Sequence, residues 1–223
     1  MDTTFHDDVL SPDWITGFDL DLPAAREGYA APSPRQVDPG PERSVIEGIA
    51  AGEITRRSVA VLAADIVGYS RLIERDDLGT VIRLRSLMRR LIAPAIAAHG
   101  GELVRQAGDG LLIAFDHALD AVACARSLRD GLELAERGRP RERRIVLRMG
   151  ISFERALTVD GDLHGRGVNI AARLEQMAEP GEIYVCALIA GAYAAARPDL
   201  FEPLGLKWLK NMSTPVDVFR LTR

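Results

Sequence analysis

Lysine, cysteine and long apolar runs are scarce or absent in this sequence of 223 residues. Only Lys207 and Lys210 are lysines, so 26 of the 28 basic residues are arginines. The two cysteines, Cys124 and Cys186, lie in apolar stretches, which favours buried thiols over a disulfide or a metal site. No unbroken apolar run approaches about 18 residues, which argues against a membrane-spanning helix. The first residues lack the basic start of a signal peptide, so we expect a cytoplasmic protein.

The overall composition is that of a soluble globular protein. Hydrophobic residues make up 47% and charged residues 27% of the chain, which excludes wholesale disorder and collagen-like repeats. The formal net charge is −4, so no strong positive field suggests nucleic acid as a partner. The length predicts one domain with a small appendage.

The composition changes near residue 43. Residues 1–43 contain nine acidic and three basic residues and six of the twelve prolines. Such a segment cannot build a packed core, so we predict that it is largely irregular and dispensable for folding. It is either a tail on the domain surface or a segment that binds a regulatory partner. Residues 44–55 are expected to form a short helical linker, and residues 56–223 the folded domain.

The apolar pattern from residue 56 onward predicts alternating strands and helices. SVAVLAADI is a continuous apolar run typical of a strand buried on both faces. Residues 78–98 and 117–136 have helical spacing, and ELVRQ and LLIAF flank a hairpin with Asp109-Gly110 at its turn. Further elements are expected as follows: strands in RIVLRMGIS, RALTV, EIYVC, LFEPLGLKWL and VDVFRLTR, and helices in VNIAARLEQMA and LIAGAYAAA.

This order predicts an α+β fold with a ferredoxin-like βαββαβ core. A C-terminal αβαββ extension follows the core. We expect an antiparallel-rich sheet with helices on one face.

Two aspartates are candidate metal ligands because of their places in this topology. Asp65 ends the first buried strand, and Asp109 is at the tip of the hairpin expected beside that strand. Paired carboxylates, water and substrate phosphates are the usual ligands of Mg²⁺. Taken singly, each has an ordinary alternative role, Asp65 as a helix cap and Asp109 as a turn residue.

Two weaker signals suggest phosphate chemistry. Gly68, in the turn after Asp65, can leave backbone N–H groups free for a phosphate. Asn169 and Arg173 are four residues apart, so they share one face of a helix behind a glycine-rich entry. An amide donor and a guanidinium together suit a developing phosphorane charge. A solvated helix start is the alternative for this pair.

Several motifs in this order resemble the catalytic domain of class III adenylate/guanylate cyclases. The resemblance is carried by DIVGYSRLIERD, HGGELVRQAGDGLLIAF, RMGIS and DLHGRGVNIAARLE, and by the spacing between them. The resemblance covers residues 56–222 and leaves residues 1–55 uncovered. It implies that the chain converts ATP to 3′,5′-cyclic AMP and pyrophosphate, with two Mg²⁺ or Mn²⁺ ions per site.

The resemblance also implies roles for individual residues. Asp65 and Asp109 match the two metal-binding aspartates of the family. Asn169 and Arg173 match the pair that orients the ribose and stabilises the transition state. Two further matches, Arg148 and Lys210, are to residues that contact the phosphates.

Asp162 matches the residue that accepts from the adenine amino group, and Arg105 occupies the position of a purine-reading lysine. Arginine in place of lysine is a departure, although both only donate. A guanine reader typically has a carboxylate there, so we expect ATP rather than GTP. A second departure is Glu154, in a turn where the family often has glycine. His99 and His164 have no ligand spacing and are expected to be structural.

The family builds each site from two chains, so the resemblance implies a homodimer with ATP at its interface. The hairpin favours the same arrangement, because side chains alternate along a strand and its tip would otherwise have to face both ends of one nucleotide. Two alternatives stay open: a catalytically silent regulatory module and a guanylate cyclase. A silent module is expected to lack a metal aspartate or the Asn–Arg pair, and this chain has all four residues.

Overall fold

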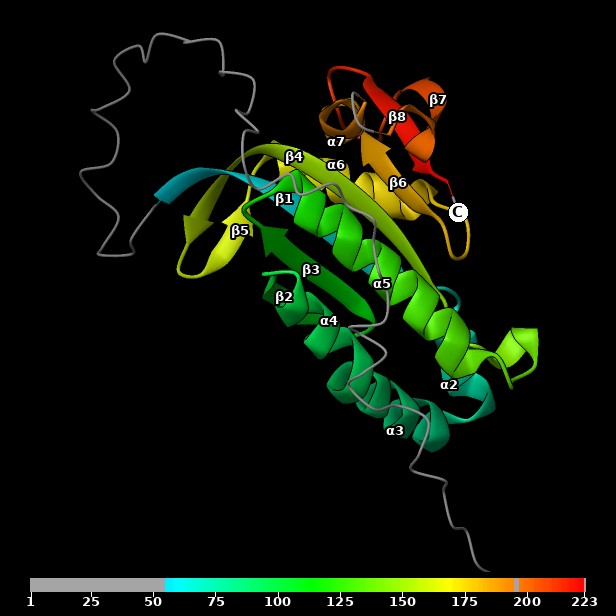
Figure 1. Cartoon of the computed structure of the whole chain (residues 1–223). Coiled ribbons are helices and arrows are strands. Elements are labelled where there is room, and N and C mark those ends of the chain that lie inside the picture. Colours follow the sequence, from blue (N-terminus) through cyan, green and yellow to red (C-terminus); the bar gives the residue numbers. More distant parts are fainter. Residues whose placement is uncertain (1–54, 195–196, 223) are drawn as a thin grey trace, which may run out of the picture. The chain divides into compact units, whose positions relative to one another are not determined.

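The computed structural model describes residues 55–194 and 197–222 of the chain (Figure 1). The predictions for residues 1–43 and for a helix within 44–52 therefore lie outside the described residues. Across the described ranges, no helix is both long enough and apolar enough to cross a membrane. Cys124 and Cys186 are both buried free thiols, as predicted.

One sheet of eight strands organises the described part of the chain. Its order is β2-β3-β1-β4-β6-β8-β7, with β5 paired to β4. Only the β4–β6 pair is parallel. The strands are β1 Thr55–Ile66, β2 Glu102–Ala107, β3 Gly110–Phe115, β4 Leu147–Val159, β5 Asp162–His164, β6 Ile183–Cys186, β7 Phe201–Lys207 and β8 Val216–Leu221.

The helices lie between the strands in the predicted order, with none in the described connections between β2 and β3, β4 and β5, or β7 and β8. The helices are α2 Tyr69–Arg75, α3 Asp77–Leu87, α4 Ala93–Ala98, α5 Ala118–Glu136, α6 Arg166–Met177 and α7 Ala187–Tyr193. The predicted α+β class with an antiparallel-rich sheet is confirmed. Helices α3, α4 and α5 of the βαββαβ core lie together on one side of the sheet (Figure 1).

The residues of β1 divide the core between two sides of the sheet. Val59, Val61 and Ala63 belong to a buried cluster that includes Ala171 of α6. Ile66 lines a small apolar cavity together with Leu84 of α3 instead. These four residues of β1 are almost fully buried although they face two different sides of the sheet, which explains the unbroken apolar run of this strand. The α6 side of the sheet carries the candidate site.

The first long helix differs from its prediction. A π-helical segment, Met88–Ile92, separates α3 from α4, so residues 78–98 do not keep one α-helical period. Leu78, Val81 and Ile82 share the apolar spacing but are 40–68% exposed. Periodicity alone does not tell which part of a long apolar stripe meets the sheet.

β4 corrects the expected turn at Glu154. The two strands predicted in RIVLRMGIS and RALTV are one strand of thirteen residues, paired with β1 from Leu147 to Thr158. Glu154 lies within this strand opposite Val59. Its carboxylate forms an ion pair of 2.5 Å with Arg166 at the start of α6. A short strand that the sequence did not reveal, β5, folds back onto the end of β4.

Gly150 sets the distance between β4 and α6. A Cβ at this position would clash with the backbone of Ala171 and Glu175. One turn earlier in α6, the Gly167 carbonyl oxygen accepts a hydrogen bond of 2.7 Å from the buried Ser152 hydroxyl of β4. These contacts seat α6 directly on the sheet, so the positions of its side chains depend on β4.

Candidate active site

Asp65 and Asp109 are neighbours at one edge of the sheet. Asp65 lies next to last in β1, and Asp109 is in the two-residue turn between Ala107 and Gly110. The turn is therefore Gly108-Asp109, one residue earlier than predicted. Burial raises the pKa of Asp109 above its usual value, and the nearby Asp65 carboxylate raises it further. Two carboxylates held this close favour a shared cation.

Arg148 lies directly opposite Asp65 in the β1–β4 pairing. Its Nη2 and Nε donate to Oδ2 of Asp65 at 2.8 and 3.2 Å. Its Nε is also 2.7 Å from Oε1 of Glu175 on α6. The Arg148 guanidinium thus connects Asp65 of β1 to Glu175 of α6, the helix that also carries the Asn–Arg pair. We call the end of the sheet where Asp65 and Asp109 meet the metal edge.

Sequence analysis did not identify Glu175. The residue is 8% exposed, and burial raises the pKa of its carboxyl to about 7, even though Arg148 is in contact with it. The available signal was a glutamate on the apolar side of an amphipathic helix, two residues after Arg173. A charged residue in such a place needs a partner, which here is Arg148.

The donor set at this edge fits a divalent cation. Carboxylate oxygens are the preferred ligands of Mg²⁺ and Mn²⁺, and the two aspartates supply them from adjacent strands. Within the ranges that the structure covers, no group of three His, Cys, Asp or Glu side chains forms a complete metal cage. An ion on Asp65 and Asp109 therefore needs further oxygens, such as those of a phosphate.

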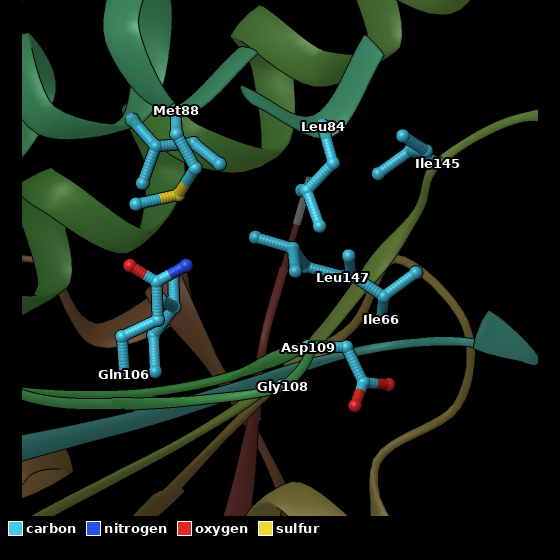
Figure 2. A pocket seen from close by; sticks show the side chains of 10 residues that line it. Ile66, Leu84, Met88, Gln106, Gly108, Asp109, Ile145 and Leu147 are labelled. Atoms are coloured by element: carbon cyan, nitrogen blue, oxygen red, sulfur yellow. The ribbon is translucent and has the colours of Figure 1, made fainter. Parts of the chain in front are cut away.

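An apolar cavity lies beneath the hairpin tip. Its lining includes Ile66, Leu84, Met88 and Leu147, with Asp109 at its margin. Figure 2 shows the Asp109 carboxylate directed away from these side chains. The cavity measures about 10 Å³, room for about one water molecule. A cavity of this size is too small to hold a nucleotide.

Gly68 follows β1 in a left-handed conformation, with φ of 66°. Its carbonyl oxygen accepts from Leu72 N, so this residue begins α2. Left-handed backbone favours glycine, which explains the residue at this turn. Gly68 lies three residues after Asp65, in the connection between β1 and α2.

The two base-reading candidates are brought together. Arg105 of β2 forms an ion pair with Asp162 at the start of β5. The Arg105 guanidinium lowers the pKa of the Asp162 carboxyl below its usual value. A shift of register between Leu103 and Arg105 interrupts the alternation of β2. The strand alternation assumed from the sequence therefore does not hold at Arg105.

Asn169 and Arg173 lie on the side of α6 that faces away from the sheet core. Ile170, Ala171 and Leu174 of the same helix are buried, whereas Asn169 is exposed and Arg173 is partly exposed. The Arg173 guanidinium donates to Gln176 of its own helix at 2.6 Å. The pair thus points outward, and in the described part of the chain neither residue forms a hydrogen bond or an ion pair with Asp65 or Asp109.

Lys210 lies in the connection between β7 and β8 and is exposed. This connection meets the start of α6, because Arg166 donates to the Thr214 hydroxyl at 3.2 Å while it pairs with Glu154. Lys210 is therefore in a loop anchored beside the Asn–Arg helix. His99 contacts Ser127 at 3.0 Å, and His164 lies 3.8 Å from Asp162.

Comparison with curated proteins finds relatives of this domain. A Rhizobium meliloti protein is 40% identical over 167 residues, which are 74% of this chain and 28% of the relative. The adenylate cyclase of Streptomyces coelicolor is 35% identical over 136 residues, 60% of this chain and 33% of that protein. The chain therefore spans about a third or less of these relatives. No family model matches it.

Solved structures cover the same part of the chain. An adenylate/guanylate cyclase/hydrolase from Silicibacter pomeroyi is 39% identical with a TM-score of 0.71, and the match covers 77% of this chain and 99% of that one. An adenylyl cyclase from P. aeruginosa has the same fold, with a TM-score of 0.68 at 21% identity, over 77% of this chain and 96% of that one. The predicted resemblance is confirmed: the chain belongs to the class III adenylate/guanylate cyclase catalytic-domain family.

Proposed function

We propose that this chain is an adenylate cyclase that converts ATP to 3′,5′-cyclic AMP and pyrophosphate. The observation that carries the proposal is the meeting of Asp65, Asp109 and Arg148 at one sheet edge. Two carboxylates and a guanidinium there suit a metal–triphosphate complex. The family supports the reaction class.

The reaction needs no protein nucleophile. Asp65 and Asp109 would hold the divalent ions, Mg²⁺ or Mn²⁺. Such ions, when bound, lower the pKa of the ATP 3′-hydroxyl and neutralise phosphate charge. The 3′-hydroxyl would pass its proton to solvent water, its oxygen would attack the α-phosphorus in line, and the bond from that phosphorus to the leaving pyrophosphate would break. Arg148 and Lys210 would bind phosphate oxygens, and the Gly68 turn would lie beside them.

Asn169 and Arg173 would act on the other side of the nucleotide. Asn169 would orient the ribose, and Arg173 would stabilise the charge that develops on the α-phosphate. Their outward direction on α6 supports a site completed between two chains. We propose that the metal edge of one subunit meets the partner subunit's Asn169 and Arg173 in a homodimer. Exposure along most of β2, the edge strand that carries Arg105, is consistent with such an interface.

The base-reading pair supports ATP as the substrate. Asp162 can accept from the adenine amino group, and Arg105 can donate to a ring nitrogen. The two side chains form an ion pair with each other, so a purine base would have to separate them in order to be read by both. Guanine offers a carbonyl oxygen where adenine has its amino group, and a carboxylate repels that oxygen.

Product identification tests this function. The purified full chain is incubated with Mn²⁺ and either ATP or GTP, and the nucleotides are separated and identified by mass. We expect cyclic AMP as the main product, with a higher kcat/KM for ATP than for GTP. Cyclic GMP as the main product would make the chain a guanylate cyclase. Tight nucleotide binding without any cyclic product would identify a silent module.

A further inference from the structure

We propose that Glu175 is the positioning residue for Arg148, retaining its guanidinium at the metal edge when a cation occupies Asp65. This inference rests on the proposed function for the roles of Asp65 and Arg148. The observation itself is independent of that function. It is the sharing of one guanidinium between two carboxylates that come from different elements, β1 and α6.

The contact between Glu175 and Arg148 is short and buried. Oε1 of Glu175 lies 2.7 Å from Nε of Arg148, and the Glu175 side chain is 10% exposed. Among the described residues, this oxygen is buried and has no hydrogen-bond partner, so the ion pair is its principal contact. Nε itself donates to Asp65. A small rotation of the guanidinium would exchange one carboxylate acceptor for the other.

Cation binding creates the need for a second acceptor. A divalent ion on Asp65 would compete with Arg148 for the same oxygen, because both positive groups favour Oδ2 and repel each other. Arg148 would then lose both of its hydrogen bonds to Asp65. With Glu175 in place the guanidinium stays anchored through Nε, and its Nη groups are free for a phosphate.

Packing alone does not explain a carboxylate at this position. Residue 175 faces the sheet beside Gly150, where the buried neighbours Ala171 and Leu174 are apolar. Burying a carboxyl group is costly, and an apolar residue of similar volume commonly serves stability as well or better. The charge is therefore explained by what it does to Arg148.

The first test reads Arg148 directly by NMR. The Nε–H signal of Arg148 is assigned with Arg148→Lys, and its solvent exchange is measured with and without Mg²⁺. We expect Glu175→Gln to speed this exchange at least about tenfold in Mg²⁺, because a charge-assisted contact is lost. The matched control is Glu182→Gln, which removes a similar glutamate–arginine contact of 3.0 Å to Arg220. It should leave the Arg148 signal unchanged.

The second test separates positioning from mere stability by kinetics. A weakened phosphate grip should raise KM for the metal–ATP complex roughly 10- to 100-fold with a smaller change in kcat. A purely structural role would reduce the amount of active enzyme and leave KM unchanged. Glu175→Asp restores the charge at shorter reach and should recover part of both readouts. If Glu175→Gln does not fold, Glu175→Asp is compared with the wild type in its place.

The outcomes distinguish the two proposals. Unchanged exchange at Arg148 in folded Glu175→Gln, or a KM within twofold of the wild type, would overturn the positioning role. If the wild-type chain forms no cyclic nucleotide, the proposed function fails. In that case KM is replaced by the Kd for Mg²⁺–ATP, and the exchange measurement still decides the role of Glu175.

Discussion

Three carboxyl groups and one guanidinium meet at the candidate metal edge, and their charges do not balance. Asp65 and Glu175 share Arg148, while Asp109 adds a further acidic group beside Asp65. An excess of negative charge in a partly buried place is unstable unless a cation compensates it. Burial raises the pKa of the Glu175 carboxyl to about 7, which shows how costly its negative charge is in these surroundings. This imbalance is what a divalent ion would correct.

Removing either aspartate should therefore abolish the chemistry without unfolding the protein. We expect Asp65→Ala and Asp109→Ala to lower kcat/KM for ATP by about 100-fold or more, because the charge stabilisation from a bound metal amounts to several kcal/mol. Circular dichroism should remain that of the wild type. The control is Asp116→Ala, which removes an exposed carboxylate paired with Arg57. Near-normal turnover in either site variant would refute the metal assignment.

The preference for ATP over GTP is a second property that depends on single residues. We expect Asp162→Ala to narrow the preference for ATP over GTP about tenfold or more, since the variant can no longer accept from the adenine amino group or repel the guanine oxygen. The measurement is the ratio of the two kcat/KM values, compared with the ratio in wild type. A ratio that favours GTP in the wild-type chain, or one that Asp162→Ala leaves unchanged, would contradict this base-reading role.

At the scale of elements, α6 and β4 together decide where the site residues point. The predicted strands and helices from residue 56 onward are largely present, because buried strands and amphipathic helices have strong periodic patterns. Continuous β4 was not predicted, since Glu154 interrupts its apolar pattern while pairing with Arg166. The shift within β2 and the π-helical segment were also not predictable, because both depend on packing between distant elements.

The site itself was predictable to a similar degree. The predicted topology and then the family motifs both pointed to Asp65 and Asp109, and the two carboxylates lie close together in the structure. Glu175 was missed because its partner, Arg148, is 27 positions earlier in the chain and meets it only through the packing of α6 on β4. Periodicity places a residue on a face of its element, whereas a contact between elements requires their registers.

Gly150 offers a test of this dependence on packing. We expect Gly150→Ala to destabilise the protein by about 1–3 kcal/mol, because the added methyl group would force α6 away from β4. Activity of the folded fraction should fall as well, since Glu175 and the Asn–Arg pair move with the helix. Chemical denaturation measures the first effect and ATP turnover the second.

The matched control is Gly191→Ala in α7, where a Cβ meets nothing within 4 Å. It should be neutral or slightly stabilising, because alanine favours the helix. Equal stability of the two variants would show that α6 does not rest on Gly150.

At the scale of the whole molecule, the candidate residues form three groups. Asp65, Asp109 and Arg148 form one, Arg105 and Asp162 another, and the outward side of α6 carries Asn169 and Arg173. Within the described residues, neither Asn169 nor Arg173 forms a hydrogen bond or an ion pair with Asp65, Asp109 or Arg148. If each nucleotide needs all three groups, two-fold symmetry lets two identical chains form two equivalent complete sites.

Complementation tests this shared site. Asp65→Ala removes the metal edge and Arg173→Ala removes a transition-state group, so each variant should be inactive alone. In a mixed dimer, one site combines both defects and the other is intact. Random exchange of equal amounts should restore about a quarter of wild-type activity, because half of the dimers are mixed and each has one working site. Each of the two variants carries a different affinity tag, and dimers that bind to both affinity resins verify that subunits have exchanged. No recovery among verified mixed dimers would show that each chain carries its own complete site.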